Sequence, residues 1–146
     1  MYLDSAIIVK LLVEEPDTAL FVQALVGHTL SSSELAAPEV LSALLGKERK
    51  KLITKAQRIE AWQAFNKRVQ SWDITLHPLN GVVLKKANHI LERCDPAVAL
   101  RTLDAIHAAA CDLAQDFPLC STDKRMRDAA GVLGIPLFPA DESPNP

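Results

Sequence analysis

Four acidic residues have the side-chain type and the positions needed to hold a metal ion. Asp4 and Asp123 each follow a short apolar run that is typical of a buried strand. Glu39 and Asp104 each lie in the first turn of an expected helix. Ligands of a parallel sheet bind beyond the carboxyl ends of its strands, so we expect these four side chains to meet at one edge. Carboxylates gathered there repel one another, and a hard cation such as Mg²⁺ or Mn²⁺ relieves that repulsion.

A site of this kind is suited to hydrolysis of a phosphodiester bond. The ion activates a water molecule and neutralises phosphate charge, so no side-chain nucleophile is needed. Ser5 and Ser121 stand beside the acids without a motif that places a histidine next to them. We expect both serines to hydrogen-bond the carboxylates or the waters of the metal. For His107, one turn after Asp104, we expect a satisfied structural role rather than zinc binding.

The segment Arg101–Cys111 is expected to be the helix that carries Asp104, with Thr102 as its N-cap. An acid in a first turn is often explained by the helix dipole alone, so Asp104 does not define a site by itself. Helical spacing predicts one apolar stripe facing the core, made of Leu103, Ile106, Ala110 and Leu113.

Strands and helices alternate along the whole chain. This alternation predicts an α/β protein, a three-layer α/β/α domain over residues 1–140 with a mainly parallel central sheet. Residues 141–146 are expected to form a disordered tail. The expected strands are 1–3, 29–31, 72–77, 117–121 and 135–138, and the expected helices are 5–13, 16–26, one starting at Pro38, one capped by Thr54, one capped by Asn80, 102–113, and 124–130 stopped by Gly131.

Composition narrows the class of protein. The chain has 146 residues, 49% of them hydrophobic and 23% charged, as in a globular domain with a sizeable core. The net charge of −2 gives no overall basic field, and an aromatic content of 5% argues against a base-stacking surface. The apolar run 6–13 is too short to span a membrane and lacks a preceding basic segment, so we expect a cytoplasmic protein with no membrane association. Its three cysteines, Cys94, Cys111 and Cys120, are expected to be buried and reduced.

Four motifs, taken together, resemble those of PIN-domain ribonucleases, and most closely the VapC-type toxins of bacterial toxin–antitoxin pairs. The resemblance runs from the first expected strand to the last. It implies that the four acids form the metal site of a Mg²⁺- or Mn²⁺-dependent endoribonuclease. The motifs are Tyr2-Leu3-Asp4-Ser5, Glu39-Val40-Leu41-Ser42-Ala43-Leu44, Leu100-Arg101-Thr102-Leu103-Asp104-Ala105-Ile106-His107 and Ser121-Thr122-Asp123-Lys124-Arg125.

The resemblance also implies partners. These are an RNA substrate (transfer or ribosomal RNA), a second copy of the chain, and an antitoxin whose C-terminal segment lies across the active site. Local basic residues must then supply RNA affinity, with Arg101, Lys124 and Arg125 the nearest to the acids and Arg127 and the 47–51 cluster further candidates.

The sequence departs from the family at two positions. Ala6 stands where a second hydroxyl or amide residue is usual, and Pro38 precedes Glu39. Glu34 is a rival to Glu39, although Ser31 and Glu34 also fit a capping box. Asp128 is expected to be a surface acid.

Two other classes of protein compete with a nuclease. One is a non-catalytic module that keeps the fold for dimerisation or partner binding. The presence of all four acids argues against this alternative. The other is a phospho-accepting receiver domain, which requires neighbouring acids after its first strand and a lysine after its last. Asp4 stands alone, and the last expected strand runs into Phe138-Pro139-Ala140, so the pattern disfavours a receiver.

Overall fold

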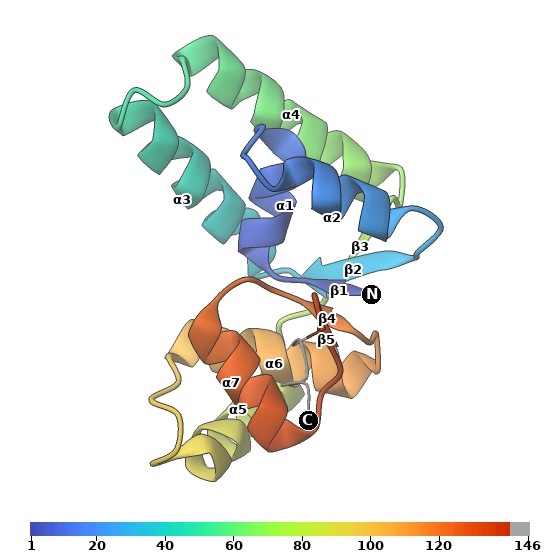
Figure 1. The fold of residues 1–146 in the computed structure, drawn as a ribbon, viewed down its shortest axis with the longest axis vertical. Coiled ribbons are helices and arrows are strands. Elements are labelled where there is room, and N and C mark those ends of the chain that lie inside the picture. Colours follow the sequence, from blue (N-terminus) through green and yellow to red (C-terminus); the bar gives the residue numbers. More distant parts are fainter. Residues whose placement is uncertain (141–146) are drawn as a thin grey trace, which may run out of the picture.

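A five-stranded sheet forms the centre of the molecule in the computed structural model, which describes residues 1–140 (Figure 1). All described strand pairs are parallel, and the strand order is β3-β2-β1-β4-β5. The predicted parallel sheet is therefore confirmed, whereas the tail expected at 141–146 lies outside the described residues. The strands are β1 (Tyr2–Leu3), β2 (Leu30–Ser33), β3 (Ile74–His77), β4 (Leu119–Cys120) and β5 (Leu137–Phe138).

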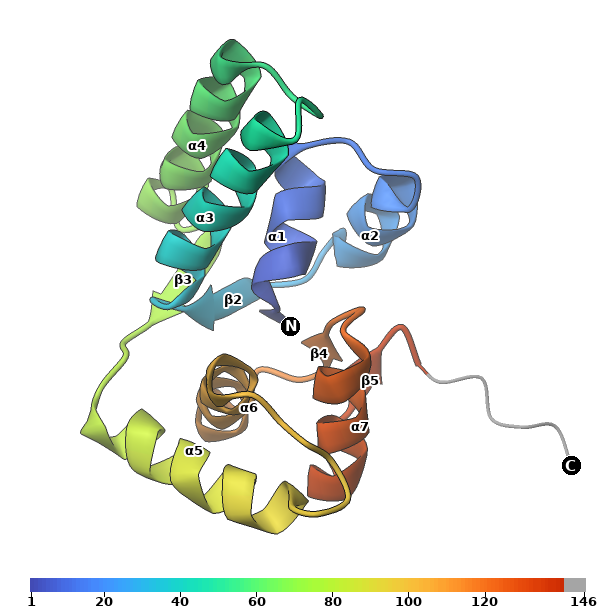
Figure 2. The ribbon, with the colours of Figure 1, turned by 90° about the vertical axis from the view of Figure 1, so that its left-hand side faces the viewer.

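Helices cover both faces of the sheet, which makes the three layers that the sequence predicted. The first four helices lie on one side and the last three on the other (Figures 1 and 2). The first group is α1 (Ser5–Leu12), α2 (Thr18–Leu25), α3 (Ala36–Arg49) and α4 (Lys55–Gln70), and the second is α5 (Gly81–Cys94), α6 (Thr102–Ala114) and α7 (Lys124–Leu133).

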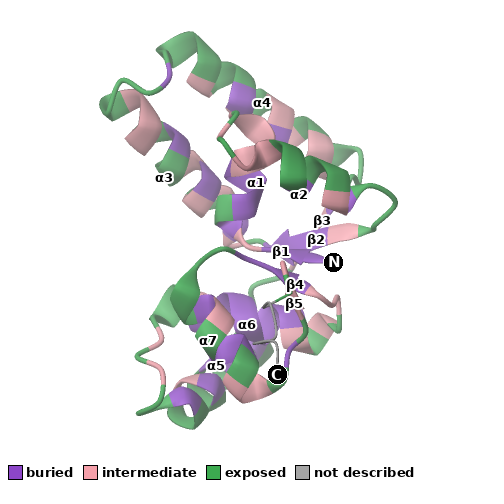
Figure 3. Cartoon of the chain, in the orientation of Figure 1, coloured by how far each residue is buried: buried purple, intermediate pink, exposed green. Residues whose placement is uncertain are grey.

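Alternation along the short strands divides the core between these two layers. Tyr2 packs with the α5–α7 layer and Leu3 with the α1–α4 layer. Leu119 and Cys120 separate in the same way, because successive strand residues point to opposite faces. All four residues have no exposed surface, so both faces of the sheet are covered (Figure 3).

Two helix starts confirm the capping signals in the sequence. At α4, Thr54 accepts from the Gln57 amide at 3.2 Å, and the Gln57 side chain accepts from the Thr54 amide at 2.8 Å. At α5, the Asn80 side chain accepts from the backbone amides of Val82 and Val83 at 3.0 and 3.2 Å. Each cap satisfies amides that have no partner inside the helix.

Several expected helix termini were wrong, and the second helix, for example, begins at Thr18 rather than at Pro16. Arg101, not Thr102, holds the N-cap position of α6 and makes no side-chain cap. The last helix passes through Gly131 and ends at Leu133, with Gly134 as its C-cap, whose φ of +73° suits a glycine. The third helix begins at Ala36, two residues before Pro38. Proline is tolerated there because amides of a first turn lack intrahelical acceptors.

The capping box expected between Ser31 and Glu34 does not form. Ser31 lies in β2, where it pairs with Tyr2 and Thr75 of the neighbouring strands. Glu34 instead accepts from the backbone amide of Leu79 at 2.9 Å and so ties the end of β2 to the loop before α5.

The apolar stripe expected on α6 was only half right. Ile106 and Ala110 are buried, but the side chains of Leu103 and Leu113 are 46% and 45% exposed. The sequence pattern favoured the large side chains, whereas the helix buries its alanines. The buried run is Ala105, Ile106, His107, Ala108, Ala109, Ala110 and Cys111.

The cysteines are free and buried, as expected. Burial raises the pKa of the Cys111 and Cys120 thiols to about 12, with nearby carboxylates adding to the shift, so both stay protonated. No helix within residues 1–140 is both long and apolar enough to cross a membrane.

Candidate active site

Asp4 lies directly after β1 and is the N-cap of α1. Its Oδ1 accepts from the Ala6 amide at 3.2 Å, and its Oδ2 accepts from Ser121 Oγ at 2.6 Å. The Asp4 amide donates to the Cys120 carbonyl at 3.0 Å, which fixes the end of β1 against β4. Residues at the ends of β1 and β4 therefore fix the position of the carboxylate. The positive end of the α1 dipole stabilises its negative charge.

Asp123 has the same local arrangement at the N-cap of α7. Its Oδ1 accepts from the amides of Arg125 and Met126 at 2.8 and 3.2 Å. The Asp123 amide donates to Ser121 Oγ at 3.1 Å, so this serine contacts both N-cap acids. The hydrogen bond from Ser121 to a carboxylate agrees with the sequence prediction.

Asp104 lies in the first turn of α6, and its surroundings disfavour the ionised form of its carboxyl. Burial raises the pKa of this carboxyl, and the charges of Asp123 and Asp4 raise it further. The backbone and charge of Arg101 oppose that shift without cancelling it. Its Oδ2 atom is buried and has no hydrogen-bond partner among the described residues. A buried carboxylate oxygen without a donor requires a compensating group.

Glu39, in the first turn of α3, is held by a different set of contacts. Its Oε2 accepts a short hydrogen bond from Ser5 Oγ and lies 2.5 Å from His107 Nε2. Burial alone would raise the pKa of this carboxyl, but the contacts with His107 and Ser5 outweigh burial and lower the pKa. Ser5 thus bonds a carboxylate, as the sequence predicted.

The structure gathers the four acids at the helix starts that follow the sheet, in two groups. Asp104 lies close enough to Asp4 and Asp123 for their charges to raise its pKa, while Glu39 lies against Ser5 and His107. Within residues 1–140, no three Asp, Glu, His or Cys side chains stand close enough to hold an ion as they are placed. Without a cation, like charges favour separated carboxylates. The unpartnered Asp104 oxygen and the all-oxygen donor set fit Mg²⁺ or Mn²⁺ in chemistry.

The basic residues expected to bind RNA lie in three places. Arg101, Lys124 and Arg125 are exposed beside the acids, and Lys124 bonds Asp128 at 2.7 Å, which confirms Asp128 as a surface acid. Arg127 has a structural role, because it donates to the carbonyls of Ser121 and Pro139 at 3.0 and 2.8 Å. The cluster at 47–51 ends α3, at the opposite end of that helix from Glu39.

Sequence reasoning missed a hydrogen-bonded chain behind Glu39. His107 is 2% exposed, and Tyr2 Oη lies 2.8 Å from its Nδ1. The expectation of a satisfied structural histidine was correct about burial, but its partners include a candidate site residue. A signal was present, because a histidine within a run of alanines must find polar partners when that helix face is buried.

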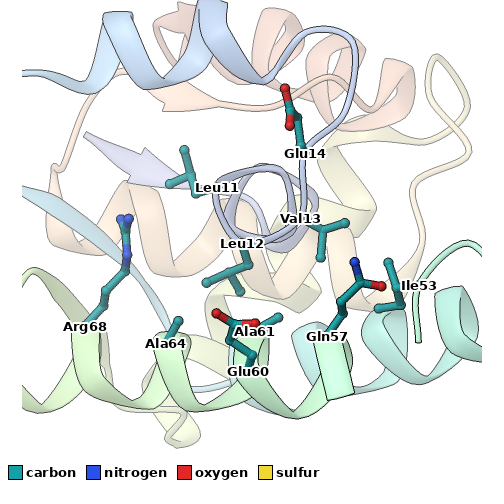
Figure 4. Close-up of a pocket in the computed structure, with 10 residues that line it drawn as sticks. All are labelled: Leu11, Leu12, Val13, Glu14, Ile53, Gln57, Glu60, Ala61, Ala64 and Arg68. Atoms are coloured by element: carbon teal, nitrogen blue, oxygen red, sulfur yellow. The ribbon is translucent and has the colours of Figure 1, made fainter. Parts of the chain in front are cut away.

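A hollow of about 320 Å³ lies between α1 and α4 (Figure 4). It adjoins the C-terminal end of α1, whereas Asp4 caps the N-terminal end. Leu12, Ala61 and Ile53 contribute apolar walls, and Glu14, Glu60 and Arg68 stand at its rim (Figure 4). None of the four candidate acids lines this hollow, so it is separate from the candidate active site.

The fold and site together define a class: a parallel α/β/α domain with acids at the helix starts beyond its strands. Residues 1–132 match the PIN domain family. The chain is 38% identical over 141 residues to Ribonuclease VapC46 of Mycobacterium tuberculosis (strain ATCC 25618 / H37Rv), covering 94% of this chain and 95% of that protein. The chain therefore belongs to the PIN domain family, and its sequence is of the VapC type. This agrees with the resemblance carried by the four motifs.

A solved structure supports the fold alone. The crystal structure of FitAcB from Neisseria gonorrhoeae superposes with a TM-score of 0.66 at 13% sequence identity, over 94% of this chain and 95% of that chain. The architecture is thus retained where little of the sequence is.

Proposed function

We propose that this chain is a Mg²⁺- or Mn²⁺-dependent endoribonuclease that acts as the toxin of a toxin–antitoxin pair and inhibits growth or translation. The observation that carries the proposal is the buried, unpartnered oxygen of Asp104 within charge range of Asp4 and Asp123. Membership of the PIN domain family and the name of the VapC46 relative support ribonuclease chemistry.

In this proposal the carboxylates of Asp4, Glu39, Asp104 and Asp123 hold the ion. A bound divalent ion supplies water activation and neutralises phosphate charge. Ser121 orients Asp4 through its 2.6 Å hydrogen bond, and Ser5 orients Glu39.

Phosphate groups of the RNA are bound by the exposed basic residues Arg101, Lys124 and Arg125. Transfer or ribosomal RNA is the proposed substrate class. The proposed antitoxin is a protein that covers the same acids with a positively charged side chain. Removal of the antitoxin exposes the acids.

Chelation tests the proposal directly. Purified protein should cleave a mixture of bacterial transfer and ribosomal RNA with Mn²⁺ or Mg²⁺, and excess EDTA should reduce the rate by at least about 100-fold. Restoring Mn²⁺ should restore cleavage, measured by gel and by sequencing of the new RNA ends. An Asp4→Asn preparation purified in parallel controls for contaminating ribonuclease. Equal cleavage with and without EDTA would contradict a metal enzyme, and absence of both cleavage and Mn²⁺ binding would favour the non-catalytic module.

We also propose a homodimer through the face formed by α5 and α6. A hollow of about 290 Å³ there is lined mainly by apolar side chains, among them Val83 and Ala110. Val82 and Leu113 line it as well and are 64% and 45% exposed. We expect light scattering to give twice the chain mass of 15.9 kDa, and Val82→Glu to give the monomer. Leu52→Glu, at an exposed leucine between α3 and α4, is the control and should leave the mass unchanged. A dimeric Val82→Glu protein would place the interface elsewhere.

A further inference from the structure

Three side chains from different elements form a continuous hydrogen-bonded chain. Tyr2 comes from β1, His107 from α6 and Glu39 from α3. Tyr2 Oη lies 2.8 Å from His107 Nδ1, and His107 Nε2 lies 2.5 Å from Glu39 Oε2. Tyr2 has no exposed surface and His107 is 2% exposed, so water does not compete for the contact between them, whereas the Glu39 side chain is 24% exposed.

The Glu39 end of the chain decides where the imidazole proton lies. An ionised carboxylate only accepts hydrogen bonds, and a glutamate carboxyl is ionised at neutral pH. His107 Nε2 must therefore carry a proton to approach Glu39 Oε2 at 2.5 Å. An unprotonated Nε2 would face the carboxylate lone pairs and be repelled.

The Tyr2 end allows the ring to remain neutral. The Tyr2 hydroxyl is buried and is protonated at neutral pH, so it has one proton to donate. If Tyr2 donates to Nδ1, the ring needs a proton on Nε2 alone.

We propose that Tyr2 and His107 are positioning residues for Glu39: the Tyr2 hydroxyl donates to Nδ1, which fixes the Nε2–H tautomer, and Nε2–H together with Ser5 Oγ holds Glu39 Oε2. The consequence for the site rests on the function proposed above. Asp104 and His107 lie one turn apart on α6, whereas Glu39 comes from the helical layer on the other face of the sheet. The chain thus sets the position of Glu39 relative to Asp104.

Ring-nitrogen NMR tests the tautomer without any metal. In the ¹⁵N-labelled full chain, His107 should show a protonated Nε2 and an unprotonated Nδ1. Tyr2→Phe removes only the hydroxyl, and we expect it to mix the two tautomers or to protonate both nitrogens. An Nδ1–H tautomer or a doubly protonated ring in the unaltered protein would overturn the assignment, as would unchanged nitrogen shifts in Tyr2→Phe.

Mn²⁺ titration tests the positioning. His107→Leu keeps bulk but loses the donor, and we expect its Mn²⁺ dissociation constant to rise about tenfold. His107→Gln keeps an N–H donor at similar reach, so it should recover most of that loss, which a role in packing alone does not explain. Equal affinities of a folded His107→Leu and the unaltered chain would overturn the positioning role. Should His107→Leu fail to fold, Tyr2→Phe takes its place in the titration. No Mn²⁺ binding by the unaltered chain would refute the proposed function, while the nitrogen shifts would still decide the tautomer.

Discussion

Asp104→Asn is expected to reduce RNA cleavage by at least about 100-fold and, at the same time, to stabilise the metal-free protein. The activity loss follows because an amide is a weak ligand for Mg²⁺ and leaves the site one negative charge short. The gain in stability follows because the Asp104 carboxyl is destabilised in the folded chain by burial and by the charges of Asp123 and Asp4. Replacement of an acid with a purely structural role would not combine a loss of cleavage with a gain in stability.

The raised pKa of Asp104 also predicts how the free energy of unfolding changes with pH. The folded pKa of Asp104 lies above its ordinary value of 3.8, so between the two the folded state binds more protons than the unfolded state. Stability therefore falls as pH rises through that window, and the penalty persists at neutral pH. Asp104→Asn should remove the penalty, so the two free energies of unfolding converge only at low pH. Denaturant unfolding in EDTA at several pH values measures this difference.

Two further variants separate the site from general charge effects. Asp4→Asn should lose cleavage to a similar extent but keep its fold, because asparagine caps a helix N-terminus as well as aspartate does. Asp73→Asn, at an exposed acid bonded to Ser71, should change neither cleavage nor metal binding. Full activity in Asp4→Asn and Asp104→Asn together would disprove the proposed roles.

The fold was predictable because its signals are local. Residues close together in the sequence are enough to indicate the caps at Thr54 and Asn80 and the alternation of strands with helices. The errors arose where tertiary contacts override local preference. The capping box expected at Glu34 gave way to a bond with Leu79 from a distant loop, and Gly131 continued a helix that a glycine often ends.

The candidate site divides in the same way. The position of each acid at a helix start follows from the strand–helix pattern, and the contacts of Ser5 and Ser121 follow from their adjacency to acids. The link from Tyr2 through His107 to Glu39 joins residues far apart in the sequence, so no local pattern contains it. Only packing of α6 beneath the sheet brings these side chains together.

Ala109→Leu is expected to cost about 1–3 kcal/mol of folding free energy and to lower RNA cleavage as well. Ala109 has no exposed surface, and its neighbours Ala105, Ala108 and Ala110 are buried too. These small side chains let α6 pack closely, and three added carbon atoms have no space without a shift of the helix. Because α6 carries Asp104 in its first turn, such a shift displaces a proposed ligand. Denaturant unfolding measures the loss of stability, a cleavage assay measures the loss of activity, and Mn²⁺ titration reports whether the ligand is displaced.

Ala56→Leu is the matched control, since Ala56 is exposed near the start of α4 and a leucine there meets solvent. Its stability should stay within about 0.5 kcal/mol of the unaltered chain. If Ala109→Leu were as stable as this control, α6 would have room for larger side chains. The expected apolar stripe with Leu103 and Leu113 would then be the better account of how α6 packs. If it lost stability but kept its Mn²⁺ affinity, α6 would anchor the core without setting the position of Asp104. Loss of both would show that the buried alanines, and not the half-exposed leucines, hold that acid in place.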